Sequence, residues 1–257
     1  MTKKHYIEDF ISYCKYCKNI IKNKDNSICE RCNNYFNQLN EIDKLSKRLN
    51  IELVENNSFS SNTYSINEQG WIINLNINAS FSFLDLSPFS NLERLDLGFN
   101  GMKFLSIDYK ELKNLKTLIL HKNQLESIEE ILSNLPNLQH LDLRDNNLKN
   151  HEFLNKISFT IEEILLDNNF LTDIPINTQW KNLKVFSLSN NRIKNIVDDI
   201  GSLKQLEELY LANNLINNFS KKILELERLQ RLSVTHNPIK RDNNILIQLK
   251  KAGVRIY

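Results

Sequence analysis

The sequence has little glycine and proline, with 5 and 4 residues among 257. Loops that cradle phosphate with backbone N–H groups need several glycines, and the known glycine-rich phosphate-binding motifs do not occur in the sequence. No apolar run approaches the 18 or more residues of a membrane span, and the polar, charged first segment does not resemble a signal peptide. We therefore expect a cytoplasmic protein without a membrane partner.

Sequence signatures of catalysis are also missing. The sequence has neither a G-x-S-x-G nor an H-E-x-x-H motif, and its four cysteines all lie in C-x-x-C pairs, which leaves none as a nucleophile. We expect no enzymatic activity and no catalytic residues. The charges nearly balance, with 33 Lys and Arg against 31 Asp and Glu, and such a balance does not favour a nucleic-acid partner.

Asparagine, in contrast, is abundant, with 39 residues, and many of them recur at one place in a repeated pattern. The pattern has apolar residues at its first, fourth and sixth positions and asparagine at the ninth. A degenerate first copy begins at Ile72, with Ser80 in the asparagine position. Full copies begin at Leu92, Leu115, Leu138, Ile161, Leu183, Leu206 and Leu229. Such self-similarity at a fixed period predicts a repeat fold.

This pattern, LxxLxLxxN followed by an apolar residue two positions on, resembles the leucine-rich repeat family over residues 69–240. The resemblance implies an α/β solenoid with a curved parallel β-sheet on its concave face and short helices or 3-10 turns on its convex face. Independently, the alternating L-x-L predicts a strand whose leucines face a core that stacked neighbours share. The buried asparagines are expected to form a ladder that satisfies backbone groups of the turns.

The sequence divides into four segments: a module (1–35) whose two C-x-x-C pairs are typical of a zinc-binding module, a helix and N-terminal cap (36–68), about eight leucine-rich repeats (69–240) and a C-terminal cap (241–257). A stripe of apolar residues from Phe36 to Leu49 predicts the helix. We expect this helix to pack on the open end of the solenoid, and the alternative is that the stripe binds a partner or dimerises. Residues 63–77 predict a hairpin, and residues 244–257 predict a helix followed by a last strand.

The four cysteines form two pairs, with eleven residues between the pairs. Each pair places two sulfurs on one tight turn, and two such turns complete a tetrahedral thiolate shell, so we expect one structural Zn²⁺. The motif resembles the zinc-ribbon and treble-clef class of zinc fingers. Two disulfides or a redox dithiol are the alternatives, and the expected cytoplasmic location favours zinc. The expected ligands are Cys14, Cys17, Cys29 and Cys32.

The residues between the inward-facing leucines face outward on the strands, and most of them are polar. In the central repeats apolar and aromatic residues stand among charged ones, a composition typical of protein interfaces. The predicted partner-binding residues are Ile119, His121, His140, Asp142, Arg144, Glu163, Leu165, Asp167, Val185 and Tyr210. We expect a non-catalytic protein-interaction module or adaptor. The alternative is a bifunctional adaptor whose zinc module contacts nucleic acid or a second protein.

Overall fold

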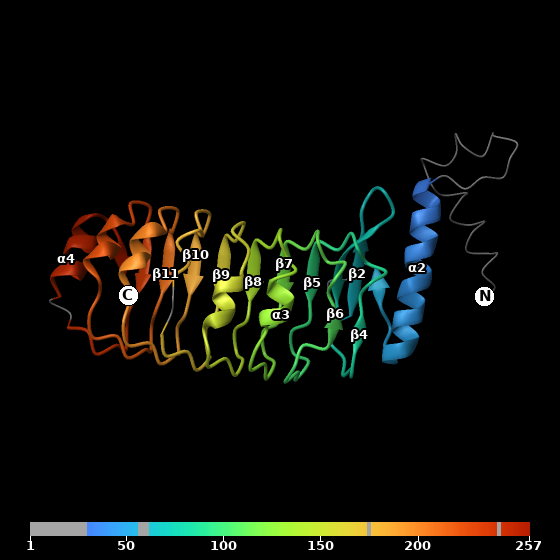
Figure 1. Ribbon diagram of the computed structural model, residues 1–257, viewed down its shortest axis with the longest axis horizontal. Coiled ribbons are helices and arrows are strands. Elements are labelled where there is room, and N and C mark those ends of the chain that lie inside the picture. Colours follow the sequence, from blue (N-terminus) through green and yellow to red (C-terminus); the bar gives the residue numbers. More distant parts are fainter. Residues whose placement is uncertain (1–29, 56–61, 174–175, 241–242) are drawn as a thin grey trace, which may run out of the picture.

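The computed structural model describes residues 30–55, 62–173, 176–240 and 243–257. These residues form a solenoid whose repeats lie side by side along its long axis (Figure 1). A long sheet runs along one side of the stack, and short helices and 3-10 turns follow on the other. The predicted leucine-rich-repeat solenoid is therefore confirmed.

The long sheet has 11 strands in the order β1-β2-β3-β5-β7-β8-β9-β10-β11-β12-β13. Neighbouring strands are parallel, except that β2 and β3 form the antiparallel hairpin predicted over residues 63–77. The central residues of successive strands are register partners, as Leu118 and Leu141 are, so the inward side chains stack. The strands are β1 (Val54–Glu55), β2 (Thr63–Ile66), β3 (Ile72–Asn76), β5 (Arg94–Asp96), β7 (Thr117–Ile119), β8 (His140–Asp142), β9 (Glu163–Leu165), β10 (Val185–Ser187), β11 (Glu208–Tyr210), β12 (Arg231–Ser233) and β13 (Arg255–Ile256).

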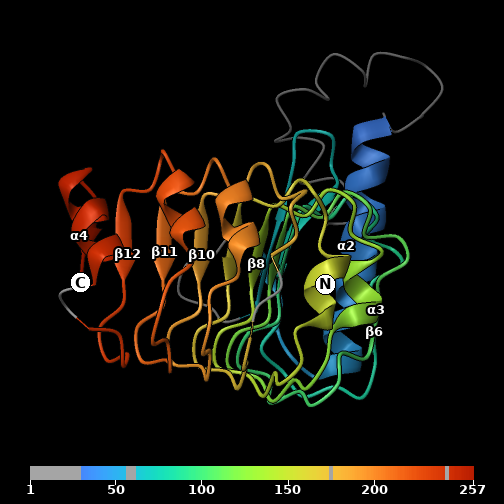
Figure 2. The same ribbon diagram turned by 60° about the vertical axis from the view of Figure 1, so that its left-hand side comes forward.

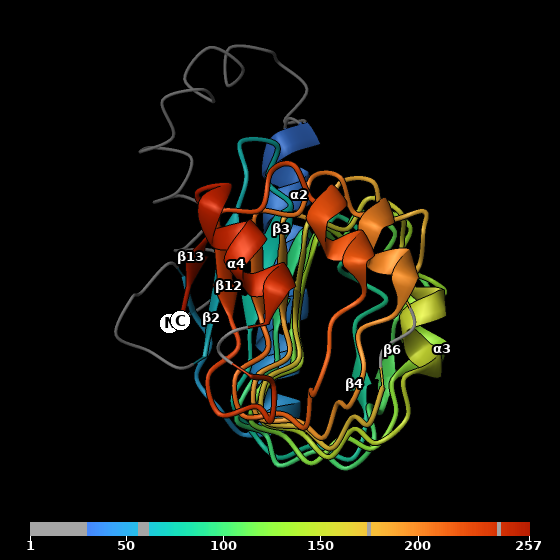
Figure 3. The same cartoon turned by 90° about the vertical axis from the view of Figure 1, so that its left-hand side faces the viewer.

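The opposite side of the stack carries shorter elements. A second sheet, which the sequence did not predict, joins β4 (Leu84–Asp85) to β6 (Ile107–Asp108) in parallel. A view along the stack places β2, β3, β12 and β13 on one side and β4, β6 and α3 on the other (Figure 3). The remaining short elements are α3 (Glu129–Leu132), η2 (Glu152–Lys156), η3 (Asp198–Ser202) and η4 (Lys221–Glu225).

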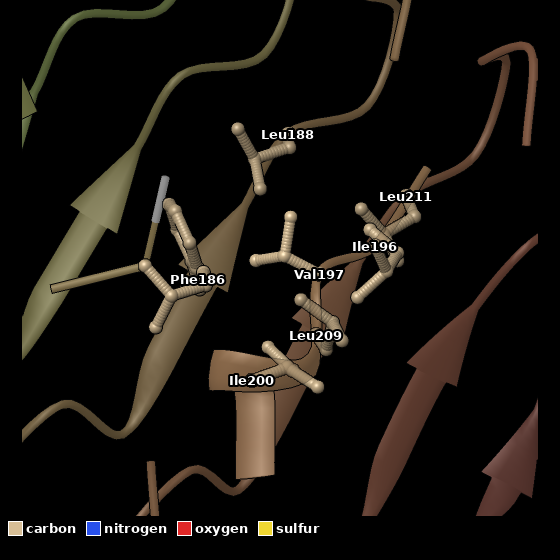
Figure 4. Close-up of a pocket in the computed structure, with 8 residues that line it drawn as sticks. Phe186, Leu188, Ile196, Val197, Ile200, Leu209 and Leu211 are labelled. Carbon is tan, nitrogen blue, oxygen red and sulfur yellow. The ribbon is translucent and has the colours of Figure 1, made fainter. Parts of the chain in front are cut away.

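The core lies between these two sides and extends from Ile42 to Val254. Trp180 is fully buried in it, and its ring meets Phe186 edge-on with 6.1 Å between ring centroids. An apolar void of about 10 Å³ lies beside Phe186, where side chains of β10, β11 and the turn through Ile196 and Ile200 face one another (Figure 4). Such a void has room for at most one water molecule and lacks polar side chains to bind it, so we regard it as a packing defect rather than a ligand site.

Helix α2 (Glu30–Leu49) packs on the N-terminal end of the sheet (Figure 2). It begins earlier than the apolar stripe that predicted it. Ile42 and Leu45 are buried against the core. Gln38 is also buried, and its side chain accepts a hydrogen bond from the N–H of Ile72 (3.3 Å) and donates one to the carbonyl of Pro88 (3.1 Å). The stripe therefore packs on the solenoid, as expected.

The C-terminal end is closed by α4 (Asn244–Lys251) and β13. The side chain of Asn243 caps α4 by accepting a hydrogen bond from the N–H of Ile245 (3.0 Å). Gly253, with φ +93°, turns the chain from α4 into β13, because glycine adopts this conformation without a steric penalty. The predicted helix and last strand are both present.

The repeated asparagines form the predicted ladder. Asn169 is 4% exposed; its Oδ1 accepts a hydrogen bond from the N–H of Leu148, and its Nδ2 donates to the carbonyls of Leu143 and Leu166, at 3.0–3.1 Å. Asn146 makes the corresponding contacts one repeat earlier. Each asparagine thus joins the turn of its own repeat to that of the preceding repeat, which fixes the spacing and orientation of the strands.

Candidate partner-binding surface

The outward positions of β5 and of β7 to β12, together with the second residue after each strand, form one continuous surface, here called the strand face. Parallel strands in uniform register place corresponding residues about 4.8 Å apart along it. Its side chains therefore form columns across the repeats. Each repeat contributes one residue to each of three columns, and the repeat that contains β8 contributes His140, Asp142 and, two residues after the strand, Arg144.

The strand face contains a hollow of about 430 Å³ over β5, β7, β8 and β9. Ile119 and Leu165 are half-buried in it and supply apolar surface beside charged side chains. The structure thus brings together six of the ten predicted partner-binding residues, Ile119, His140, Asp142, Arg144, Glu163 and Leu165. It adds three lining residues that the sequence prediction missed, Arg94, Thr117 and Leu141.

Asp142 occupies an outward position, but its side chain is largely buried, with only 10% of it exposed. Its Oδ1 accepts a hydrogen bond from Nε of Arg144 (2.9 Å), and its Oδ2 accepts one from Nη2 (2.7 Å). This bidentate pairing raises the pKa of Arg144 above its ordinary value, with the hydrogen bond as the largest cause. Asp142 therefore positions Arg144, and Arg144 is the member of the pair that is exposed to a partner.

His121 lies beside this pair. Its Nδ1 is 3.3 Å from Oδ2 of Asp142, but this contact lacks hydrogen-bond geometry. The Nδ1 atom therefore has no hydrogen-bond partner among the described residues. The imidazole lies against Gly98, where an added Cβ would be 3.0 Å from Cε1 of His121. A Cβ at position 98 would therefore force the imidazole to move by a few tenths of an ångström. With 22% of its side chain exposed, His121 lines the edge of the surface rather than the hollow.

Phe99, which the sequence prediction missed, extends the surface beside His121. It is 54% exposed, its ring meets His121 edge-on at 5.0 Å, and the Lys122 ammonium lies 4.5 Å from its centroid. Phe99 has φ +62°, a left-handed conformation that the residue before the ladder asparagine adopts throughout the repeats. Asparagine and aspartate suit this conformation better than phenylalanine. An exposed aromatic residue in a strained backbone conformation is typical of a binding surface. In a leucine-rich repeat, an aromatic residue directly before the ladder asparagine could therefore be used to predict such a surface from the sequence.

Within the hollow, His140 and Glu163 face each other across neighbouring strands. Nδ1 of His140 lies 3.4 Å from Oε2 of Glu163, and 43% and 35% of these side chains are exposed. Both therefore contact solvent and are accessible to a partner. Together with Arg94 and Arg144 they give the hollow polar walls of both signs around the aliphatic side chains.

The other predicted residues lie beyond the hollow, toward the C-terminal end. Oδ1 of Asp167 accepts hydrogen bonds from the Ser187 hydroxyl (2.6 Å) and the N–H of Ser189 (2.9 Å). Val185 lies on the next strand, β10. The Tyr210 hydroxyl donates to Oε2 of Glu208 (2.5 Å), and this bond is the largest cause of a raised Tyr210 pKa. These residues thus belong to the same face but not to the same hollow.

Of the predicted zinc ligands, Cys32 is described, and Cys14, Cys17 and Cys29 lie outside the described residues. Cys32 is buried, 1% exposed, in the first turn of α2. Within residues 30–55, 62–173, 176–240 and 243–257, no group of three or more His, Cys, Asp or Glu side chains is arranged to hold a metal ion. In the same part of the chain, no helix combines the length and the apolar character that crossing a membrane requires.

Two protein-family models match parts of the repeat region. A model described as leucine rich repeat matches residues 90–148, and a model of two leucine rich repeat copies matches residues 181–226. These two segments of the chain thus consist of leucine-rich repeats. A search of the curated proteins found no match.

Solved structures share the fold. A leucine-rich-repeat protein of Leptospira interrogans is 27% identical with a TM-score of 0.65, and the alignment covers 80% of this chain and 54% of that protein. The chain thus spans about half of the Leptospira protein. Internalin C2 of Listeria monocytogenes is 24% identical with a TM-score of 0.59, over 72% of this chain and 81% of that one. A second internalin from the same organism, inlF, is 21% identical with a TM-score of 0.55, over 76% of this chain and 64% of that one. The internalins show the fold alone.

Proposed function

We propose that this chain is a non-catalytic protein-interaction module that binds its partner on the strand face, with the hollow around Ile119 and Leu165 at the centre of the contact. Leucine-rich-repeat domains generally mediate protein–protein interactions, which supports a protein as the partner. The observation that carries the proposal is the hollow itself, because it combines half-buried aliphatic side chains with exposed polar walls.

The hollow is also organised before a partner arrives. Arg144 is held by two hydrogen bonds to Asp142, whose carboxylate is largely buried. A guanidinium whose orientation is already fixed loses less side-chain entropy on binding than a free one. The strands beneath the hollow are fixed in turn by the asparagine ladder. A rigid surface with an apolar centre and a polar rim is how many protein interfaces are built.

Leu165→Lys tests this proposal. The lysine stem occupies the hollow and its ammonium extends into solvent, so the fold should persist while the complementary surface is lost. We expect about a tenfold or greater loss of affinity, which corresponds to about 1.4 kcal/mol or more. The partner is captured from an extract of the native host, identified by mass spectrometry and purified, and its dissociation constant is measured by calorimetry.

Phe159→Lys is the matched control. It introduces the same charge at a residue that is 59% exposed in the segment before β9, away from the hollow. We expect the control to bind like the wild type, and both variants to keep the wild-type circular dichroism spectrum. Equal partner affinities for Leu165→Lys and the wild type would show that the partner binds elsewhere.

We also propose that the four cysteines bind one structural Zn²⁺. The support is the spacing of the two C-x-x-C pairs, together with the burial of Cys32 in the first turn of α2. The purified chain should contain about one zinc per molecule by elemental analysis, and Cys17→Ser should lose it, because three thiolates do not complete a structural site. Retention of zinc by Cys17→Ser, or a wild-type chain purified without zinc under reducing conditions, contradicts this assignment.

The bifunctional alternative is tested by a chain that begins at Glu30, which lacks the first three cysteines but keeps α2. Since Ile42 and Leu45 pack on the core, this chain should remain folded. If the zinc module is part of the cap, the truncated chain binds the strand-face partner normally and loses no other ligand. If the module is a second binding domain, the truncation removes a protein or a nucleic acid that the full chain captures.

A further inference from the structure

Two arginines lie next to each other at the C-terminal end of the sheet, one on the last strand of the strand face and one on β13. Arg231 of β12 and Arg255 of β13 are direct register partners, so their Cα atoms are about 4.8 Å apart and their side chains leave the sheet on the same face. Like charges directly opposite each other destabilise a sheet. Local conflicts of this kind are expected at functional sites.

The two arginines differ in their partners. The guanidinium of Arg231 pairs with Oε1 of Glu208 on β11. The second carboxylate oxygen of Glu208 accepts the hydrogen bond from Tyr210, so both oxygens of Glu208 are already used. Arg255 is exposed, and no carboxylate of the described residues lies within ion-pair distance of it. Its guanidinium therefore keeps its donors for an external acceptor.

Two tyrosines frame the arginine pair. Ser233 is the register partner of Tyr210, and β13 continues the sheet beyond it, with the N–H of Tyr257 donating to the carbonyl of Leu232 (3.0 Å). Because side chains alternate along a strand, Tyr257 faces the same side as Arg255, and it is 55% exposed. Ser233, which lies between the two tyrosine positions, has a small side chain. The arginine pair is therefore bordered by two aromatic residues.

The surrounding end of the molecule is positive. Residues 228–257 contain seven Lys and Arg and one Asp, an excess of six, whereas the chain as a whole carries +2, so residues 1–227 carry −4. Lys240, Lys250 and Lys251 are exposed. Figure 3 shows α4, β12 and β13 together at the end of the stack that faces the viewer. An anion that approaches Arg255 therefore meets a favourable field.

We propose that Arg231 and Arg255 form an anion subsite that binds Asp or Glu carboxylates of an acidic segment of the protein partner. A carboxylate between the two guanidinium groups relieves their repulsion and accepts charge-assisted hydrogen bonds from the unused donors of Arg255. Because this inference rests on the proposed function, the partner spans the strand face from the hollow at β8 to the subsite at β12, four strands or about 19 Å.

The test uses the full chain and two fluorescein-labelled probes, an octaglutamate peptide and a 12-nucleotide single-stranded DNA, with binding followed by fluorescence anisotropy. We expect the peptide to bind the wild type and Arg255→Gln to weaken this binding about fivefold or more. Arg228→Gln removes the same charge from an exposed residue that precedes β12 and lies off the strand face, and it should weaken binding less than about twofold. The melting temperature of Arg255→Gln should equal or exceed that of the wild type, since a repulsion is removed.

Three results would overturn the subsite. Equal effects of Arg255→Gln and Arg228→Gln mean that general charge attraction explains the binding. A stronger effect of Arg255→Gln on DNA than on the peptide means that the ligand is a phosphodiester. A lower melting temperature means that Arg255 is structural. Binding of the purified native partner distinguishes the two proposals. If Leu165→Lys weakens this binding and Arg255→Gln does not, only the proposed subsite is wrong. If Arg255→Gln weakens it and Leu165→Lys does not, the hollow is not the binding site and the subsite remains supported.

Discussion

Trp180→Ala is expected to lower the free energy of unfolding by about 3–5 kcal/mol. Trp180 is fully buried and meets Phe186 edge-on, so its removal leaves a large cavity and ends an aromatic contact. The apolar void beside Phe186 shows that this part of the core is already incompletely filled, and the rigid stack limits the collapse that would close a new cavity. Urea denaturation followed by circular dichroism measures the loss.

Trp180→Phe distinguishes the stabilising effect of the indole's volume from the destabilising effect of its buried polar N–H group. The Trp180 Nε1 is buried and has no hydrogen-bond partner among the described residues. Phenylalanine removes this unsatisfied donor while it keeps an aromatic ring, so we expect it to cost less than half as much as alanine. Phe104→Ala, at a residue that is 73% exposed, is the control and should change stability by less than about 0.5 kcal/mol. An equal loss for Trp180→Phe and Trp180→Ala would contradict this account.

Asn169→Ala is expected to cost about 3 kcal/mol, because each buried group left without a partner costs about 1–3 kcal/mol. The substitution leaves the N–H of Leu148 without its acceptor and removes donors from the carbonyls of Leu143 and Leu166. These groups belong to two successive repeats, so their loss weakens the connection between repeats as well as one turn. The measurement is again the free energy of unfolding in urea.

Asn155→Ala is the control for the ladder. Asn155 is exposed in η2, and its replacement should change stability by less than about 0.5 kcal/mol. The slope of the urea transition gives a second readout. If Asn169→Ala uncouples the repeats, the transition broadens, because a repeat array unfolds as one unit only while neighbouring repeats stabilise each other. A sharp transition with wild-type stability would show that the ladder contributes little.

The fold was predictable because each repeat has the same local pattern of apolar residues and asparagine. Alternating leucines place one side of every strand inward, and the ladder asparagines at Asn146 and Asn169 mark the turn that follows. Separate local patterns outside the repeats predicted the hairpin at the N-terminal end and the helix α4 at the C-terminal end. The sheet of β4 and β6 was missed, because strands of two residues leave too short a pattern to read.

The candidate site was predictable only as columns of outward residues. The columns correctly grouped Ile119, His140 and Leu165 around the hollow. They did not distinguish Asp142, whose carboxylate is largely buried under Arg144, from the exposed Glu163 in the next repeat. The pairing of side chains depends on their rotamers and on the space between neighbouring residues, such as the space beside Gly98 that the His121 ring occupies. A periodic sequence pattern predicts neither the rotamers nor this space.

The sequence by itself determined the repeat, the inward leucines and the asparagine ladder, since these depend on interactions that recur at fixed spacing. Only the tertiary structure decided that the strand face has a hollow, that Arg144 is oriented by Asp142, and that Arg255 lies opposite Arg231. The hollow and the arginine pair depend on contacts between residues more than 20 positions apart, which the register between stacked repeats places side by side. The pairing of Asp142 with Arg144, within one repeat, depends instead on side-chain rotamers and on the burial of the Asp142 carboxylate.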